Sequence, residues 1–140
     1  MLSQGLLQSS ERDLSVAKLS PAAFEGVVME AIASIPEALR QRLANVDVLI
    51  EQWPSAADLA AAEVPEGYTL FGLYTGVPLT ERTSGYNMVL PDRITIYRGP
   101  LLAALHDVDE LKDEIRATVI HEFAHFFGLS DADLERLGVA

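Results

Sequence analysis

Two histidines and a glutamate near the end of the chain have the types and spacing of a metal-dependent hydrolytic site. His121 and His125 are four residues apart in a segment with helical periodicity. Their side chains therefore lie on one helix face, about 40° apart around the axis and about 6 Å apart along it, and both imidazoles can reach one zinc ion. Glu122 points about 100° away from His121, which suits a base acting on water in the metal's open position better than it suits a ligand.

The residues after His125 offer a third ligand. Gly128 ends the helix and allows the chain to turn back, and Asp131 follows this turn. Two histidines, one carboxylate and one water would complete a tetrahedral catalytic site, with one Zn2+ per chain. Asp131 is also an ordinary acid for the first turn of a helix capped by Ser130, and Glu135 on that final helix is the rival ligand.

Three more polar residues precede the histidine pair. His106 lies 15 residues before His121, which is about 20 Å at about 1.5 Å per helical residue, so it is predicted not to share the metal. Thr118 and Glu114 precede His121 by three and seven residues and lie on roughly the same face. They either support the ligands from behind or are exposed to solvent.

The composition restricts the partners of such a site. The 140 residues suffice for one domain, and 49% of them are hydrophobic, enough for a core. Ten basic against 21 acidic side chains give a net charge of −11, which disfavours nucleic acids and anionic membrane surfaces and favours cations. The sequence has no cysteine, no spanning segment and no signal peptide, so we expect a cytoplasmic protein without disulfides or thiolate ligands.

Helical and strand patterns are mixed along the chain and predict an α+β domain with one small sheet. Residues 1–18 are weakly patterned and predict a loosely ordered arm, so the domain is expected to span residues 19–140. Glycine- and proline-rich residues 75–91 predict a long loop. The other predicted elements are helices over 21–34, through Leu39 and Leu43, after Ser55, and over 100–105, 107–128 and 131–137, and strands over 46–50, 68–74 and 92–98.

The last predicted strand alternates in character. Ile94 and Ile96 point to one side, and Arg93, Thr95 and Tyr97 point to the other. This pattern predicts a half-buried strand, with a position at the edge of the sheet or an ordinary structural position as the two alternatives.

The segment His121–Asp131, HEFAHFFGLSD, matches the pattern HExxHxxGxxD. It resembles the signature of the zincin metallopeptidases, in the extended form in which the metzincins place a third histidine. More of the chain resembles the minimal zincin-like family of small bacterial proteins with this motif, formerly a domain of unknown function. The resemblance covers roughly residues 20–138, through Phe24-Glu25, the strand near Val46, and residues 72–80, 90–97 and 118–120.

The resemblance implies a compact zincin-like single domain in which a small mixed sheet packs on an active-site helix. It implies that His121, His125 and Asp131 bind zinc and that Glu122 is the catalytic base. Only nine residues follow Asp131 in the sequence, so we expect neither the methionine turn of metzincins in its usual place nor the distant glutamate ligand of gluzincins.

An upstream edge strand that pairs with the substrate backbone is also implied. On this chain the strand would be residues 93–98, with Thr95, Tyr97 and Arg98 beside the substrate. Tyr86 and Tyr97 are the candidates for an oxyanion stabiliser.

The predicted reaction is hydrolysis of a peptide or protein substrate, in which Glu122 takes a proton from zinc-activated water and passes it to the leaving amine. The alternative is a non-catalytic metal- or peptide-binding protein that retains the site. A metal-dependent ribonuclease with a related histidine pattern is a third class, which Glu122 and the net charge of −11 disfavour. The oligomeric state and the cleavage specificity are left open.

Overall fold

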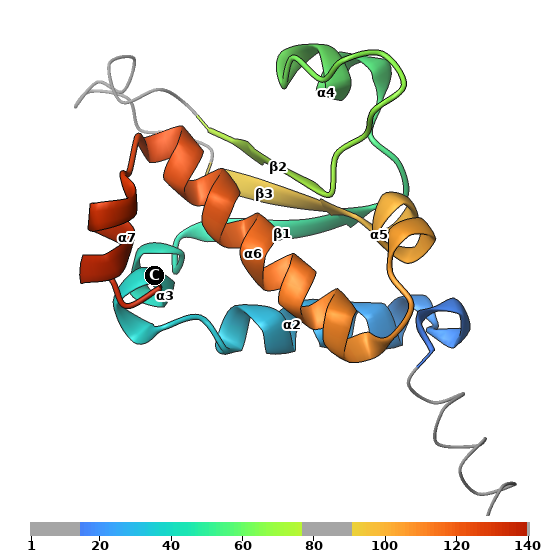
Figure 1. Cartoon of the computed structure of the whole chain (residues 1–140), viewed down its shortest axis with the longest axis horizontal. Coiled ribbons are helices and arrows are strands. Elements are labelled where there is room, and N and C mark those ends of the chain that lie inside the picture. The colour runs from blue at the N-terminus through green and yellow to red at the C-terminus, as the bar shows by residue number, and fades with distance from the viewer. Residues whose placement is uncertain (1–14, 77–90, 140) are drawn as a thin grey trace, which may run out of the picture.

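In the computed structural model, two long helices lie side by side over one face of a three-stranded sheet (Figure 1). The structure describes residues 15–76 and 91–139. Its elements, in chain order, are the 3-10 helix η1 (Val16–Lys18), α2 (Pro21–Ala33), α3 (Glu37–Arg42), β1 (Val46–Glu51), α4 (Ala56–Ala61), β2 (Gly72–Thr75), β3 (Asp92–Tyr97), α5 (Arg98–Ala104), α6 (Val108–Phe127) and α7 (Asp131–Arg136). The predicted α+β fold class is confirmed.

The order of strands in the sheet is β1-β3-β2, with β3 in the centre. β3 pairs in parallel with β1 and antiparallel with β2. The expectation that residues 93–98 form an edge strand is therefore wrong, because β3 has a neighbour on both sides. The strand is also more than half-buried. Thr95 and Tyr97, which alternate with the core residues Ile94 and Ile96, are themselves buried, and only Arg93 is exposed.

Local sequence signals set the helix boundaries. Ser20 caps α2 by accepting a hydrogen bond from the Ala23 N–H. Ser55, Asp107 and Ser130 each start a helix through a capping box, in which the cap side chain and the third helical residue satisfy each other's backbone N–H. The predicted helices at these positions are confirmed.

The predicted strand over residues 68–74 is shorter in the structure. β2 begins only at Gly72, and Tyr68 lies in a turn with 71% of its surface exposed. The predicted loop over 75–91 falls mostly on residues 77–90, outside the described residues.

The core lies between the sheet and the pair α2 and α6. It contains Phe24, Val28 and Ala31 of α2, Ile94 and Ile96 of β3, and Leu111, Ile115, Val119 and Phe123 of α6. Val16, from the segment assigned to the arm, is 3% exposed and belongs to this core, and Ser15 forms an isolated bridge with Asp107. Residues 1–14 of that arm lie outside the described residues.

None of the helices in the described ranges is long and apolar enough to cross a membrane. α6 is the longest, with 20 residues, but it carries charged side chains along its exposed side. The compartment in which the protein works stays a prediction.

Candidate active site

The candidate ligands lie around the end of α6. Gly128 ends this helix in the left-handed conformation, at φ 65°, where a glycine has no steric penalty. The Leu129 N–H donates to the Ala124 carbonyl at 2.8 Å, and the Gly128 N–H donates to the His125 carbonyl at 3.4 Å. These two bonds tie the reversing chain to the helical turn that carries His125, and α7 folds back beside the C-terminal half of α6 (Figure 1).

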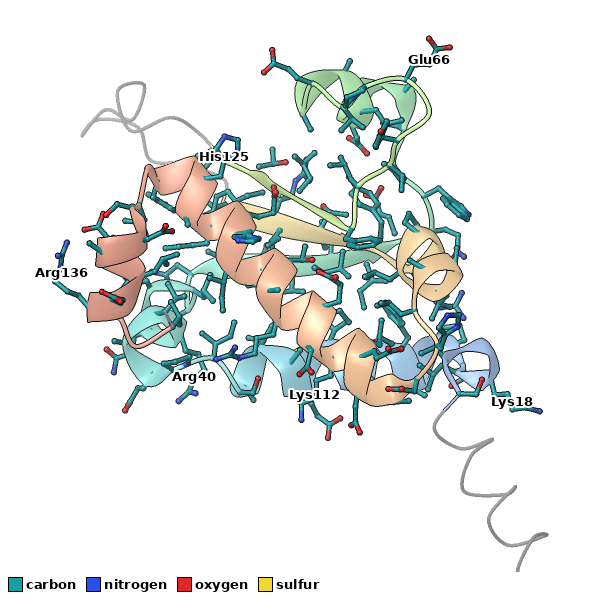
Figure 2. All side chains as sticks on the ribbon, in the orientation of Figure 1. Lys18, Arg40, Glu66, Lys112, His125 and Arg136 are labelled. Atoms are coloured by element: carbon teal, nitrogen blue, oxygen red, sulfur yellow. The ribbon has the colours of Figure 1, made fainter. Side chains whose placement is uncertain are left out.

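His121 and His125 are both exposed on α6. Within the described part of the chain, neither imidazole makes a hydrogen bond, so their ring nitrogens are available to a ligand. Figure 2 shows the His125 imidazole at the C-terminal end of α6, on the side of β2 rather than of α7. The two histidines therefore lie on consecutive turns of one helix, as the motif predicts, and their binding of a single zinc ion stays a prediction.

Glu122 is tied to the sheet. Its Oε1 accepts a hydrogen bond from the backbone N–H of Tyr74, 48 residues earlier in the chain, at 3.1 Å. The side chain is partly buried, which makes this bond to a carboxylate stronger than one in water. Glu122 is therefore held against β2 rather than being free in solvent.

Strand β2 directs backbone groups away from the sheet at the same place. The Phe71 carbonyl accepts a hydrogen bond from the Tyr97 N–H of β3 at 2.9 Å, and alternate residues of an antiparallel strand point their backbone groups the same way. The backbone N–H and C=O groups of Leu73 therefore face β3, like the Phe71 carbonyl. The backbone groups of Gly72 and Tyr74 point away from β3. We call this side, on which no strand pairs in the described residues, the outer edge of β2.

The ring of Tyr74 anchors β2 on α6. Its centroid lies 4.5 Å from that of Phe126, 5.7 Å from that of Phe127 and 6.0 Å from that of Phe123. The Tyr74 hydroxyl donates to Asp92 of β3 at 2.7 Å. These contacts fix the position of the Tyr74 N–H, and so they fix the direction in which Glu122 is drawn.

Two cavities flank α6 and divide the candidate residues between them. The first, of about 360 Å³, lies at the outer edge of β2 and is lined by Ala61, Ala62, Leu70, Leu73, Tyr74, Glu122, His125 and Phe126. The second, of about 350 Å³, lies between α6 and α7 and is lined by Arg116, Ala117, Ile120, His121, Asp131, Leu134 and Val139. The candidate base and one histidine thus face β2, whereas the other histidine shares its cavity with Asp131.

The donor set fits zinc in its chemistry, because imidazoles and a carboxylate are ligands that this ion takes. Across residues 15–76 and 91–139, however, no three histidine, aspartate or glutamate side chains lie close enough together to hold a metal ion. The assignment of His121, His125 and Asp131 as ligands stays a prediction, as does the rival, Glu135. Glu135 is exposed on α7 and lines neither of the two cavities.

The residues predicted to lie beside the substrate on residues 93–98 have structural roles instead. Tyr97 is 1% exposed, and its hydroxyl donates to Asp58 of α4 at 3.0 Å. Arg98 begins α5 and donates to the Leu19 carbonyl and to Gln52. Thr95 is buried in the centre of the sheet. The substrate-strand assignment of Thr95, Tyr97 and Arg98 is therefore wrong, since no substrate reaches a central strand.

The Tyr97–Asp58 pair also explains two shifted ionisations. Burial, followed by the hydrogen bond to Asp58, raises the pKa of Tyr97 above its usual value. The backbone N–H of Ser55 lowers the pKa of Asp58, burial opposes this effect, and the Tyr97 hydroxyl adds to the lowering. Because its proton is already donated to Asp58, Tyr97 is a poor oxyanion stabiliser. The other candidate, Tyr86, lies outside the described residues.

The remaining polar residues near the histidines are also placed. His106 is exposed at the opposite end of α6, before its first turn, as the distance argument predicts. Thr118 is 8% exposed, and its methyl group lies against Gly72 of β2. Its hydroxyl donates to Glu114 at 3.5 Å. Sequence reasoning missed Tyr74 as the partner of Glu122, although residues 72–80 belong to the stretch that carries the family resemblance.

Known proteins support the same fold and family. The family model described as zincin-like metallopeptidase matches residues 43–139. No curated protein matches the chain. Among solved structures, the chain is similar in fold to a conserved hypothetical protein from Thermo thermophilus, with a TM-score of 0.53 and 23% identity, over 78% of this chain and 94% of that one.

Proposed function

The chain belongs to the family of zincin-like metallopeptidases, and we propose that it is a zinc-dependent peptidase whose substrate lies along the outer edge of β2. One observation carries this proposal. The candidate base, Glu122, and a candidate ligand, His125, line one cavity with Tyr74, whose N–H holds the base. An acid, an imidazole and a strand edge on which no other strand pairs within residues 15–76 and 91–139 meet at this cavity, and peptide hydrolysis needs these three features together.

The outer edge of β2 replaces residues 93–98 as the proposed substrate strand. Gly72 directs its backbone groups toward this outer edge, so an extended peptide can add to the sheet there by main-chain hydrogen bonds. Main-chain pairing is largely independent of side chains, and this makes a peptide or protein a suitable substrate class. The Tyr74 N–H is already used by Glu122, which places the base directly beside the proposed peptide.

His121, His125 and Asp131 are the residues proposed to hold the zinc ion. A zinc ion held by these residues would supply Lewis-acid chemistry, which would lower the pKa of a bound water toward about 7 and polarise the scissile carbonyl. Glu122 takes the proton from the attacking water and then gives it to the leaving amine. The bond from Tyr74 holds one carboxylate oxygen, so the other oxygen is the one that accepts the proton.

Metal content tests the ligand assignment. The protein is purified without chelator or nickel column, and its zinc is compared with that of a His121→Ala, His125→Ala double variant and of His106→Ala as the matched control. We expect one zinc per chain in the parent and the control and none in the double variant. Equal zinc in all three would contradict the assignment.

Turnover of a broad peptide library by zinc-loaded protein tests the reaction. Glu122→Gln should keep its zinc and lose about 10²- to 10⁴-fold in rate, whereas Glu30→Gln, an exposed glutamate on α2, should match the parent. Full activity in Glu122→Gln would refute the assigned base. Bound zinc without turnover of any peptide would identify a non-catalytic metal-binding protein instead.

A further inference from the structure

The cavity between α6 and α7 carries a cation for which the proposed reaction has no use. Arg116 lines it together with His121 and Asp131. Arg116 is partly buried and makes no ion pair and no side-chain hydrogen bond within the described residues.

Four of the other five arginines in the described ranges are engaged, and the fifth, Arg93, is exposed on β3. Arg40 and Arg98 donate to backbone carbonyls. Arg136 pairs with Asp133, and Arg42 lies over the ring of Phe123, 5.7 Å from its centroid. Arg116, in contrast, lines a cavity and has no hydrogen-bond partner among residues 15–76 and 91–139, and the donor fork of its guanidinium fits a carboxylate in bidentate geometry.

The position of Arg116 relates it to the candidate zinc site. Arg116 and Ile120 are one turn apart on α6, and Ala117 and His121 are one turn apart beside them, so the four form one wall of the cavity. Arg116 lies five residues before His121, or about 7.5 Å along the axis. About two residues of an extended peptide, at about 3.3 Å each, cover a similar distance.

The rest of the cavity suits the stem of a side chain or the end of a peptide. Ile120, Leu134 and Val139 supply apolar contacts around the arginine. Asp131 is the acid in the lining, and it would repel a carboxylate unless its charge is taken up by zinc. The inference therefore rests on the proposed function, in which Asp131 is a ligand.

We propose that Arg116 binds a carboxylate of the peptide substrate in the cavity between α6 and α7, and that it makes the protein selective for carboxylate-bearing peptides. The carboxylate comes either from an acidic side chain or from the C-terminus of the peptide. The two sources share one chemistry, and the experiment separates them.

Binding to zinc-loaded, full-length Glu122→Gln protein measures this selectivity without turnover. Three fluorescent peptides of one sequence are compared: one with an internal glutamate and an amidated end, one with glutamine and a free C-terminal carboxylate, and one with glutamine and an amidated end. We expect one of the two carboxylate peptides to bind about 10- to 100-fold more tightly than the neutral peptide, as a charged hydrogen-bonded pair provides. The tighter peptide identifies the source.

Arg116→Gln should reduce this preference to none, and Arg116→Lys should restore part of it. Lys112→Gln is the matched control. Lys112 lies on the same helix, one turn before Arg116 and away from His125 (Figure 2), and it does not line the cavity. Equal binding of the three peptides, or a preference that survives Arg116→Gln, overturns the inference. Wild-type protein that cleaves all three peptides equally overturns the inference as well and leaves the peptidase intact. Arg116-dependent binding, with no turnover of these peptides or of the broad library, refutes the peptidase and supports the carboxylate site.

Discussion

Replacing Gly72 with alanine tests whether close packing of β2 on α6 positions Glu122. A Cβ on Gly72 would lie 2.7 Å from Thr118 Cγ2 and 3.1 Å from the Thr95 carbonyl oxygen. Carbon atoms pack at about 3.5–4.0 Å, so β2 and α6 must separate by about 1 Å. Thr118 yields little, because a β-branched side chain on a helix has few rotamers.

The same displacement reaches the proposed base. The hydrogen bond from the Tyr74 N–H to Glu122 is 3.1 Å long, and an increase of about 1 Å ends it. Overpacking costs about 1–3 kcal/mol of unfolding free energy, from which about 0.4–1 kcal/mol is recovered because alanine restricts the unfolded chain. Gly72→Ala should therefore destabilise the protein by roughly 1–2 kcal/mol and release the Tyr74 amide to solvent.

Thr118→Ser removes the clashing methyl group and keeps the hydroxyl. Alone it should cost about 0.8 kcal/mol, the value of one buried methyl group. Combined with Gly72→Ala, it should cost at least about 1 kcal/mol less than the sum of the two single changes. Urea unfolding followed by circular dichroism gives the free energies, and hydrogen exchange of the Tyr74 amide reports the bond to Glu122. Strictly additive free energies, or a Tyr74 amide as protected in Gly72→Ala as in the parent, would refute the reasoning.

Two further predictions concern ionisation and the turn after the histidines. The pKa of Asp58 is lowered, chiefly by the Ser55 backbone N–H, and that of Tyr97 is raised, chiefly by burial. The stability that these two groups contribute should therefore be complete between about pH 4 and pH 10, decline below that range as Asp58 is protonated, and decline above it as Tyr97 ionises. Tyr97→Phe should lower the free energy of unfolding by about 1 kcal/mol near neutral pH. In a tyrosine titration followed by absorbance at 295 nm, it should remove one tyrosine from the late phase that accompanies unfolding. Loss of a tyrosine from the early phase instead would contradict this prediction. Gly128→Ala should cost about 1–2 kcal/mol, since alanine is strained at a φ of 65°, and thermal unfolding measures it; an unchanged Tm would show that the turn does not need glycine.

Features encoded in neighbouring residues could be predicted from the sequence. The helix starts at Ser20, Ser55, Asp107 and Ser130, and the stop at Gly128, follow from side-chain caps and a glycine within three residues of each boundary. The motif likewise places its two histidines on one face of one helix. In both cases the physical cause is local, so no knowledge of the fold is needed.

Features that depend on distant residues could not be predicted in this way. The alternation of β3 predicts a strand, but an alternating pattern does not show which strands lie on either side. Tyr97 has the position of an outward-facing residue, yet it is 1% exposed, and its hydroxyl donates to Asp58, 39 residues earlier. The bond between Tyr74 and Glu122 spans 48 residues. Residues 93–98 were a wrong prediction for the substrate strand because such contacts between distant residues cannot be read from a local pattern.

If the contact between β2 and α6 positions the base, then losing core volume there should affect turnover more than an equal loss elsewhere. Phe123 and Phe24 form a matched pair for this test, because they are 1% and 0% exposed and each lies under an arginine, at 5.7 and 5.9 Å. Phe123 meets the ring of Tyr74, whereas Phe24 belongs to α2.

Replacing either residue with leucine should lower the free energy of unfolding by a similar amount, about 1–2 kcal/mol. At a temperature where both variants are folded, kcat of the proposed peptidase should fall in Phe123→Leu and stay near the parent value in Phe24→Leu. Chemical shifts of the Tyr74 amide should change in the first variant alone, which separates positioning from general destabilisation. Equal losses of kcat at equal stability would show that the base depends on the core as a whole, and not on the strand to which it is bonded.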